Sequence, residues 1–233
     1  MTNFISGAVS TMLVFAAHPD DEVLGCGGTI ARLSSEGVHI HVIFFTDGVS
    51  ARDEMVSSNE SIERRAAAKT AMKILGAKSV TFGAYPDNRM DSVDLLDIVQ
   101  FVELQIHDYA PQMILTHHAG DLNIDHRLVH QATITACRPQ PNHCVKTILF
   151  FEVPSSTEWQ TPGSAPGFSP NWFVDISDYL EIRTRALEAY ADEMRSWPHS
   201  RSLQAINHLA RWRGATVGVD AAEAFMLGRN IVK

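Results

Sequence analysis

A short apolar run that ends in acidic residues constrains the fold of this chain more than any other feature. Thr11–Ala16 has the length and composition of a buried β-strand, and Ala17-His18-Pro19-Asp20-Asp21-Glu22 follows it directly. The next residues, 22–36, have helical spacing although glycines occupy positions 25, 27 and 28. A glycine costs a helix roughly 1 kcal/mol relative to alanine, so we expect the backbone here to approach a ligand or the sheet closely. The polar stretch is therefore predicted to lie at a strand-to-helix turn.

Strands and helices alternate along the first two thirds of the chain. Further strands are predicted at 38–45, 79–83, 112–116 and 146–153, and helices between them at 62–75, 93–109 and 127–137. This alternation is typical of βαβ units, so the expected fold class is α/β, a Rossmann-like and mainly parallel sheet with helices on both faces.

Carboxylates follow directly on several of the predicted strands, namely Asp20, Asp47, Asp87 and Asp121. Ligands of parallel α/β sheets bind beyond the carboxyl ends of the strands. We therefore expect these four side chains to share one rim, with the functional site on it.

The last third of the chain is less regular. Residues 154–171 are rich in proline, serine and glycine, and a loop of this length is expected to be a lid or a subunit contact of a possible homo-oligomer. A strand is predicted at 172–176, a helix capped by Asp178 and Glu181 that runs to about 196, and another helix at 202–213. No domain boundary is evident, so residues 1–233 are expected to form a single domain.

Composition narrows the class of protein. The chain of 233 residues carries a formal net charge of −8, which argues against nucleic acid and anionic membranes as partners. It has no apolar run long enough to suggest membrane insertion, and Met1-Thr2-Asn3-Phe4 lacks the pattern of a signal peptide. The three cysteines show no CxxC spacing, as expected in a reducing compartment. We therefore expect a cytoplasmic protein that acts on a small molecule.

Two polar clusters contain the donors of a candidate metal site. A catalytic zinc site uses about three protein ligands and leaves one position open for water. His18 and Asp21 can face one point from the strand-to-helix turn, and His126, in the cluster that follows the predicted strand 112–116, can supply a third ligand. Asp20 is expected to point toward the water instead and to accept its proton as general base. Taken alone, each cluster also fits a capped helix N-terminus.

The same residues resemble a known family. The six-residue motif at 17–22, the glycines after it and the downstream Asp-His pair are similar to the LmbE/PIG-L family of zinc-dependent N-deacetylases, over about residues 11 to 153. The resemblance implies a Rossmann-like fold, the three metal ligands named above and Asp20 as general base. It further implies Zn²⁺ as cofactor, although the same ligands accept other divalent metals. The implied reaction is hydrolysis of the acetamide of an N-acetylglucosamine-like sugar or its conjugate, with release of acetate.

One position departs from the family pattern. Many members carry His-Pro-Asp-His in the second cluster, where the first histidine helps to stabilise the oxyanion, whereas this chain has Asn123-Ile124-Asp125-His126. Asn123 can donate a hydrogen bond but cannot carry a proton. Either it suffices together with zinc, or another histidine does this work, the candidates being His117, His118 and His199. Asp125 either orients a ligand or caps the helix, and His130 is expected to lie near the site without being a ligand.

Three arginines are candidates for substrate binding. Arg64 matches an arginine often found in the family, although Ala67 stands where the family often has a glutamate. Arg52 and Arg89 lie on predicted rim loops, where plain surface charge explains them equally well. Any of the three could hold a sugar hydroxyl or a phosphate.

Two other functions compete with deacetylation. Gly25-Cys26-Gly27-Gly28 suggests a nucleotide-binding Rossmann module, but Ile30 stands where the fingerprint requires a glycine or alanine. The second alternative is a catalytically silent sugar-binding relative, against which Asp20 argues because a binder needs no base beside a metal. The sequence therefore favours a metal-dependent N-acetyl amino-sugar deacetylase, without specifying which sugar.

Overall fold

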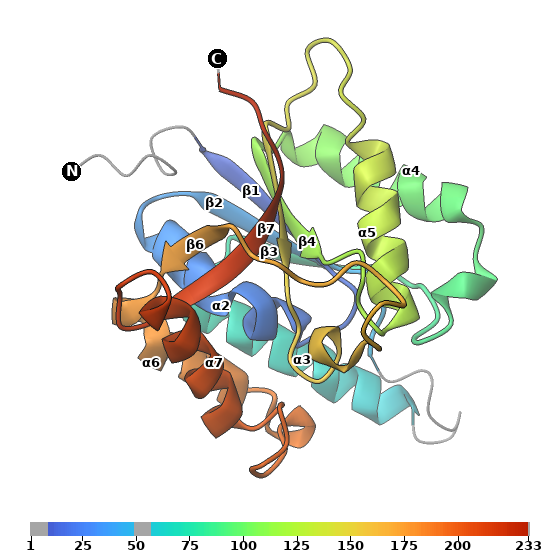
Figure 1. Ribbon diagram of the computed structural model, residues 1–233. Helices are drawn as coiled ribbons and strands as arrows, with labels where there is room; N and C mark the ends of the chain where they lie inside the picture. Colours follow the sequence, from blue (N-terminus) through green and yellow to red (C-terminus); the bar gives the residue numbers. More distant parts are fainter. Residues whose placement is uncertain (1–8, 49–56, 233) are drawn as a thin grey trace.

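The computed structural model describes residues 9–48 and 57–232, and within them the chain forms a seven-stranded sheet between two layers of helices (Figure 1). The strand order is β3-β2-β1-β4-β5-β7-β6. The strands are β1 (Thr11–Ala16), β2 (His39–Phe44), β3 (Ser79–Phe82), β4 (Met113–His117), β5 (Thr147–Phe151), β6 (Trp172–Asp175) and β7 (Ala222–Asn230). Strands β1 to β5 pair in parallel, whereas β7 runs antiparallel to both β5 and β6. The expected α/β class with a mainly parallel sheet is confirmed.

Helices cover both faces of the sheet (Figure 1). The α-helices are α2 (Asp21–Ser35), α3 (Ser57–Leu75), α4 (Leu95–Tyr109), α5 (Ile124–Ala136), α6 (Leu180–Glu188) and α7 (Leu203–Ala215). Short 3₁₀ turns are η1 (Met90–Ser92), η2 (Thr157–Trp159), η3 (Ser177–Tyr179) and η4 (Ala191–Glu193). Within the described residues, no helix is both long and apolar enough to cross a membrane.

Strand β1 separates two apolar cores. Met12 and Val14 pack with α2, α3, α6 and α7, while Leu13 and Phe15 pack with α4 and α5. Successive side chains of a strand point to opposite faces of the sheet, and here both faces are covered. This double burial explains why β1 is apolar from Met12 to Ala16 and why it ends where the polar motif begins.

Helix α2 presses against the sheet and is broken near its start. Cys26 has non-helical backbone angles (φ −150°, ψ 23°), so α2 consists of two helical segments. A Cβ atom at Gly25 would overlap the ring of Phe151, and one at Gly28 would lie 2.8 Å from Ile176. The glycines in the first turns therefore permit close approach of the backbone to neighbouring elements, as the sequence predicted.

A buried ion pair satisfies the backbone groups at this break. Glu223 of β7 accepts hydrogen bonds from the N–H groups of Gly28 (2.8 Å) and Thr29 (2.7 Å), at the start of the second segment. Arg183 of α6 donates to the carbonyl of Leu24 (2.7 Å) in the first segment and lies 3.1 Å from Glu223. Elements from the last third of the chain thus hold the helix that follows the polar motif.

The structure corrects the sequence prediction in the C-terminal third. The helix predicted to reach about 196 ends at Glu188 and is followed by η4. Asp178 does not cap this helix, because Asp178 lies within η3 and the residue at the N-cap of α6 is Tyr179. In η3, Ser177 Oγ donates a hydrogen bond to Asp175 Oδ1 (2.6 Å). Strand β7 was not predicted, since an alanine-rich start and a polar end give it no clear period of two.

Candidate metal and catalytic site

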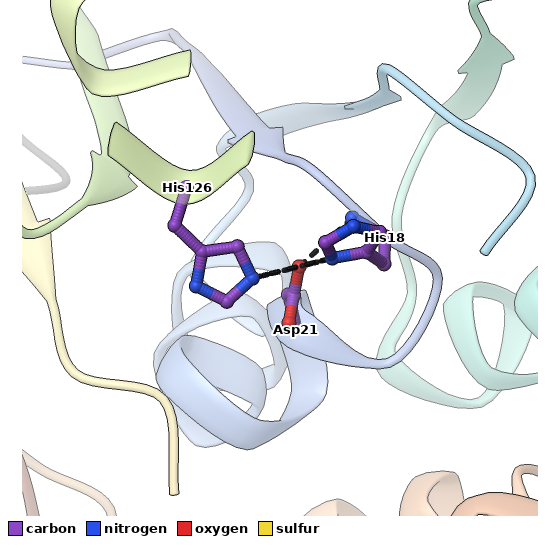
Figure 2. A group of neighbouring side chains, drawn as sticks. All are labelled: His18, Asp21 and His126. Carbon is purple, nitrogen blue, oxygen red and sulfur yellow. Dashed lines mark hydrogen bonds and ion pairs between the residues drawn. The ribbon is translucent and has the colours of Figure 1, made fainter. Parts of the chain in front are cut away.

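Three side chains from two strand ends converge on one point and form what we call the donor triad, His18, Asp21 and His126 (Figure 2). His18 and Asp21 lie at the turn from β1 into α2, and His126 lies in the first turn of α5, after the neighbouring strand β4. His18 Nδ1, Asp21 Oδ2 and His126 Nε2 are each 3.2 Å from the other two. All three residues are buried and face one another, and their role as metal ligands stays a prediction.

The other nitrogen of each triad imidazole contacts a carboxylate. His18 Nε2 lies 3.1 Å from Asp125 Oδ2 and 3.2 Å from Asp87 Oδ1, and His126 Nδ1 lies 3.1 Å from Asp121 Oδ1. A proton donated outward to these carboxylates leaves the inward nitrogen with a lone pair, which is the usual arrangement around a metal-binding histidine. The donor set and its support therefore fit a divalent metal ion.

The carboxylates around the donor triad raise the pKa of its two histidines. Burial alone lowers the pKa of His18, but hydrogen bonds to Asp125 and Asp21 together with nearby carboxylates outweigh it and raise the pKa to about 10. For His126 the balance is similar, with the charges of Asp21 and Asp121 raising the pKa to about 9. The imidazolium groups in turn hold the pKa of Asp21 well below its usual range, although burial opposes this. The triad thus carries protons that a metal would displace.

Asp20 lies beside the triad in an unusual conformation. Its φ of 118° falls in the left-handed region that residues other than glycine rarely adopt. Asp20 Oδ2 accepts hydrogen bonds from Arg201 Nη1 (3.0 Å) and Arg64 Nη2 (3.4 Å). Burial raises the pKa of the Asp20 carboxyl, and these two guanidinium groups oppose that rise.

The buried carboxylate of Glu22 holds the backbone of Asp20. The N–H of Asp20 donates to Glu22 Oε2 (2.9 Å), and the hydroxyl of Tyr190 donates to Glu22 Oε1 (2.7 Å). Burial raises the pKa of Glu22 to about 8, although the hydrogen bond from Tyr190 opposes it. Tyr190 follows α6, so the last third of the chain also supports this turn.

Asn123 and Asp125 have distinct places at the start of α5. Asn123 caps the helix, since its Oδ1 accepts from the N–H of Asp125 (2.8 Å), and its Nδ2 donates to Asn88 Oδ1 (3.0 Å). Asp125 contacts His18 as described and accepts backbone hydrogen bonds from Asn88 (2.7 Å) and Met90 (3.1 Å). Of the two readings of Asp125 that the sequence left open, contact with a candidate ligand fits the structure, and capping of α5 belongs to Asn123.

A cavity of about 260 Å³ opens onto the donor triad, and we call it the triad cavity. Besides the triad, it is lined by Asp20, Gly48, Arg64, Asp87, Asn88, Asn123, Ser155, Ser156, Glu193 and Arg201. A second possible donor group, His18 with Asp87 and Asp125, shares one histidine with the triad. Asp125 does not line the cavity and is fully buried, so the donor triad is the group that a substrate can reach.

Of the remaining predicted residues, those that the structure describes lie outside the triad cavity. His117 accepts a hydrogen bond from the N–H of Ala17 (2.8 Å) and stacks on His126, His118 lies 2.8 Å from the carbonyl of Pro166, and His130 lies 2.9 Å from the carbonyl of His117. His199 accepts a hydrogen bond from the N–H of Arg201 (3.0 Å). Arg89 is exposed, and Arg52 lies outside the described residues. Neither Arg89 nor any of these histidines faces the cavity, so none takes the place of the histidine missing at Asn123.

Sequence reasoning missed the residues that the C-terminal third brings to the site. Arg201 belongs to no motif in the sequence, yet it contacts Asp20 and also donates to Ser155 Oγ (3.0 Å). Glu193 is buried and pairs with Arg64. No spacing in the sequence connects position 201 with position 20, because only the packing of α6, η4 and α7 brings them together.

The loop at 154–171 contributes support to the donor triad. The hydroxyl of Thr157 donates to Asp121 Oδ2 (2.6 Å), and Ser156 Oγ donates to Asp121 Oδ1. These bonds favour the charged carboxylate, which contacts His126, and with the imidazolium they hold the pKa of Asp121 well below its usual range despite burial. The role of this loop as a lid or subunit contact stays a prediction.

Comparison with known proteins places the chain among deacetylases. Residues 13–137 match the family described as PIG-L, GlcNAc-PI de-N-acetylase. A protein of Escherichia coli described as the uncharacterized deacetylase YaiS is 31% identical over 185 residues, covering 77% of this chain and 89% of that protein. The diacetylchitobiose deacetylase of Thermococcus kodakarensis is 26% identical over 200 residues, covering 79% of this chain and 70% of that enzyme.

The fold is shared more widely than one reaction. The solved structure of a 4-carboxy-2-hydroxymuconate hydratase from Pseudomonas putida aligns with a TM-score of 0.79 and 24% identity, covering 96% of this chain and 98% of that one. At this identity the likeness concerns the fold alone. The family match over residues 13–137 spans more than half of the chain and includes both polar clusters. Together with the relative from Escherichia coli, it confirms the resemblance read from the motif at 17–22. This chain belongs to the PIG-L family.

Proposed function

We propose that this protein is a metal-dependent hydrolase that removes the acetyl group from an N-acetylated amino sugar or its conjugate, with Zn²⁺ as the resident metal. One observation carries the proposal: the donor triad, whose imidazoles contact supporting carboxylates, lines the same cavity as Asp20. The match to a de-N-acetylase family and the likeness to a diacetylchitobiose deacetylase supply the class of substrate.

The donor triad would hold the metal through His18 Nδ1, Asp21 Oδ2 and His126 Nε2. A bound zinc ion supplies Lewis acidity at the water and at the amide carbonyl. Asp125 and Asp121 keep the two imidazoles in the tautomer that donates a lone pair inward. Because Asp125 touches His18 and not the cavity, its contribution is to position the ligand.

Asp20 is the general base in this proposal. Arg201 and Arg64 both hold Oδ2, while among the described residues Oδ1 accepts no hydrogen bond. The carboxylate can therefore accept a proton from the attacking water and return it to the leaving amine. Asp20 has a left-handed backbone, and the hydrogen bonds to its side chain come from Arg201 and Arg64 rather than from the two residues that flank it in the motif.

Asn123 lines the cavity where the family pattern has a histidine, and we assign it the hydrogen bond to the carbonyl oxygen. One N–H of its amide donates to Asn88, which leaves the second for the substrate. Of the candidate arginines that the structure describes, Arg64 lines the cavity and Arg89 does not. Asn123 carries no proton, so Asp20 is the residue that both accepts and returns the proton.

Acetate release tests the proposal directly. Metal-loaded protein is incubated with N-acetylated amino sugars and their conjugates, with and without a chelator. Release that a chelator abolishes and zinc restores is the expected result. Absence of acetate from every substrate, with one metal bound per chain, would refute the deacetylase assignment, and hydration of an unsaturated carboxylic acid would then become the reaction to test, given the hydratase that shares this fold.

Substitution of the base separates catalysis from metal binding. Asp20→Asn is expected to keep the metal and lower kcat by about 10²–10⁴-fold, because general-base catalysis typically contributes that factor. Metal content is measured by elemental analysis and turnover by acetate release. A variant as active as the wild type would show that Asp20 is not the base, and a silent sugar-binding protein would show no turnover to lose.

A further inference from the structure

A second cavity adjoins the triad cavity and is larger, with a volume of about 490 Å³. It lies between α3 and the segment that joins α6 to η4, and we call it the α3–η4 cavity. Four carboxylates line it, those of Glu60, Glu63, Asp192 and Glu193, and the small side chains of Ala66 and Ala67 leave its α3 wall open.

Two residues form a wall common to both cavities. Arg64 and Glu193 line each of them and pair with one another through Arg64 Nη1 and Glu193 Oε1. Arg64 is only 8% exposed, and its Nε has no hydrogen-bond partner among the described residues. A buried N–H gains free energy from a hydrogen bond, so the Arg64 side chain between the two cavities can still donate one.

We propose that the α3–η4 cavity is the subsite for the part of the substrate beyond the N-acetylated sugar, and that this part is a neutral or cationic polyhydroxylated group. The inference rests on the proposed deacetylase function and deepens it. It selects a glycoside or an amine-bearing conjugate from the substrates that the sequence left open, and it disfavours a nucleotide sugar or a phospholipid-linked sugar.

Size supports the assignment of two compartments. Sites for drug-sized ligands measure about 300–1,000 Å³. The triad cavity, at about 260 Å³, falls just below that range and suits one sugar ring with its acetamide. A conjugate needs further space, and the α3–η4 cavity offers about 490 Å³ across the shared wall.

Charge decides the chemistry of the second group. Among the described residues, the α3–η4 cavity has four carboxylates and one arginine in its lining, and that arginine is already paired with Glu193 and with Asp20. Like charges repel, so a phosphate group would be disfavoured here, whereas hydroxyl and ammonium groups can donate hydrogen bonds to the carboxylates.

A set of three substrates tests the charge preference. We compare the kcat/KM of N-acetylglucosamine, of a neutral N-acetylated disaccharide and of a nucleotide-linked N-acetylglucosamine. The disaccharide is expected to exceed the monosaccharide by at least tenfold, and the nucleotide sugar is expected to gain nothing over the monosaccharide. A nucleotide sugar that exceeds the disaccharide would overturn the proposal.

Filling the cavity tests its location. Ala66→Trp places a large side chain on the wall of the α3–η4 cavity, and Ala67→Leu is a smaller alternative should the first variant fold poorly. Both are expected to lower kcat/KM for the disaccharide toward the value for the monosaccharide, while leaving the monosaccharide value unchanged. Lys69→Trp is the matched control, since Lys69 is an exposed residue of the same helix that does not line the cavity.

A binding measurement keeps this test independent of turnover. Calorimetry with metal-loaded Asp20→Asn protein measures the Kd of the disaccharide, with and without Ala66→Trp. At least tenfold weaker binding in the double variant supports the subsite even if no acetate is released, in which case only the proposed reaction fails. Equal Kd values with and without Ala66→Trp and Ala67→Leu, together with equal kcat/KM for mono- and disaccharide, would refute the subsite.

Discussion

Asp125→Asn tests whether the carboxylate behind His18 positions that ligand. Asp125 accepts three hydrogen bonds, at Oδ2 from the N–H of Asn88 (2.7 Å) and from His18 Nε2 (3.1 Å), and at Oδ1 from the N–H of Met90 (3.1 Å). An asparagine has one acceptor oxygen and one NH₂ group. Whichever way the amide turns, its NH₂ group must face at least one of these donors.

The size of the effect follows from these contacts. Loss of an outer carboxylate partner typically lowers metal affinity by about 10–100-fold, or about 1.4–2.8 kcal/mol. Since the donor left facing the NH₂ group is buried, the metal-free variant should also lose about 1–3 kcal/mol in the free energy of unfolding. Metal affinity is measured by competition with a chromogenic chelator, and unfolding by urea titration.

Two comparisons make the result interpretable. Asp178→Asn removes an exposed carboxylate of η3 and should leave metal affinity unchanged. Asp87 Oδ1 also lies 3.2 Å from His18 Nε2 and could take over the hydrogen bond, so Asp87→Asn is measured alone and together with Asp125→Asn. Metal affinity within twofold of the wild type, in both the Asp125 variant and the double variant, would refute the idea that these carboxylates orient His18.

Four further outcomes follow from the structure. Tyr190→Phe removes the hydroxyl that donates to Glu22, so the free energy of unfolding, measured by urea titration, should fall by about 1–2 kcal/mol. The kcat should also fall while the metal content stays unchanged. An unaltered kcat would show that the hydrogen bond between Tyr190 and Glu22 does not affect catalysis. Gly25→Ala places a methyl group into the ring of Phe151 and should destabilise the protein by about 1–3 kcal/mol, read from the same titration. The pKa values of the two triad imidazoles, about 10 and about 9, predict that metal binding at pH 7.5 releases about two protons, measurable by calorimetry in buffers of different ionisation enthalpy. Since these pKa values are raised in the folded state, the metal-free protein should be stabilised below pH 6.5 and lose that contribution as the pH rises through about 9 to 10; stability that increases over that interval would contradict the assignment.

The parts of this protein that could be predicted are those whose determinants are local in sequence. The apolar run of β1 requires a strand covered on both faces, and the structure covers it so. Spacing alone placed His18 and Asp21 on one turn, and the parallel sheet order brought His126 to them from the adjacent strand end. Strand β7 escaped prediction because its burial depends on β5 and β6 on either side.

The residues that act on Asp20 from far along the chain could not be predicted. Arg201 and Tyr190 reach the turn at Asp20 and Glu22 only after α6, η4 and α7 have packed. Nothing in their neighbourhood in the sequence distinguishes them from a surface arginine or a core tyrosine. For Arg89 the sequence left substrate binding and plain surface charge open, and its side chain is exposed and does not line the triad cavity.

The break in α2 at Cys26 makes the first and last parts of the fold interdependent. The short segment that begins with Asp21 ends in carbonyl groups held by Arg183, and the next segment begins with N–H groups held by Glu223. The short helical segment that carries Asp21 is thereby hydrogen-bonded to α6 and packed next to β7, which both lie beyond the region matched by the family, residues 13–137. Shortening the chain before β7 would spare every triad residue and still leave Asp21 on an unanchored turn, so this protein cannot be reduced to its motif-bearing half.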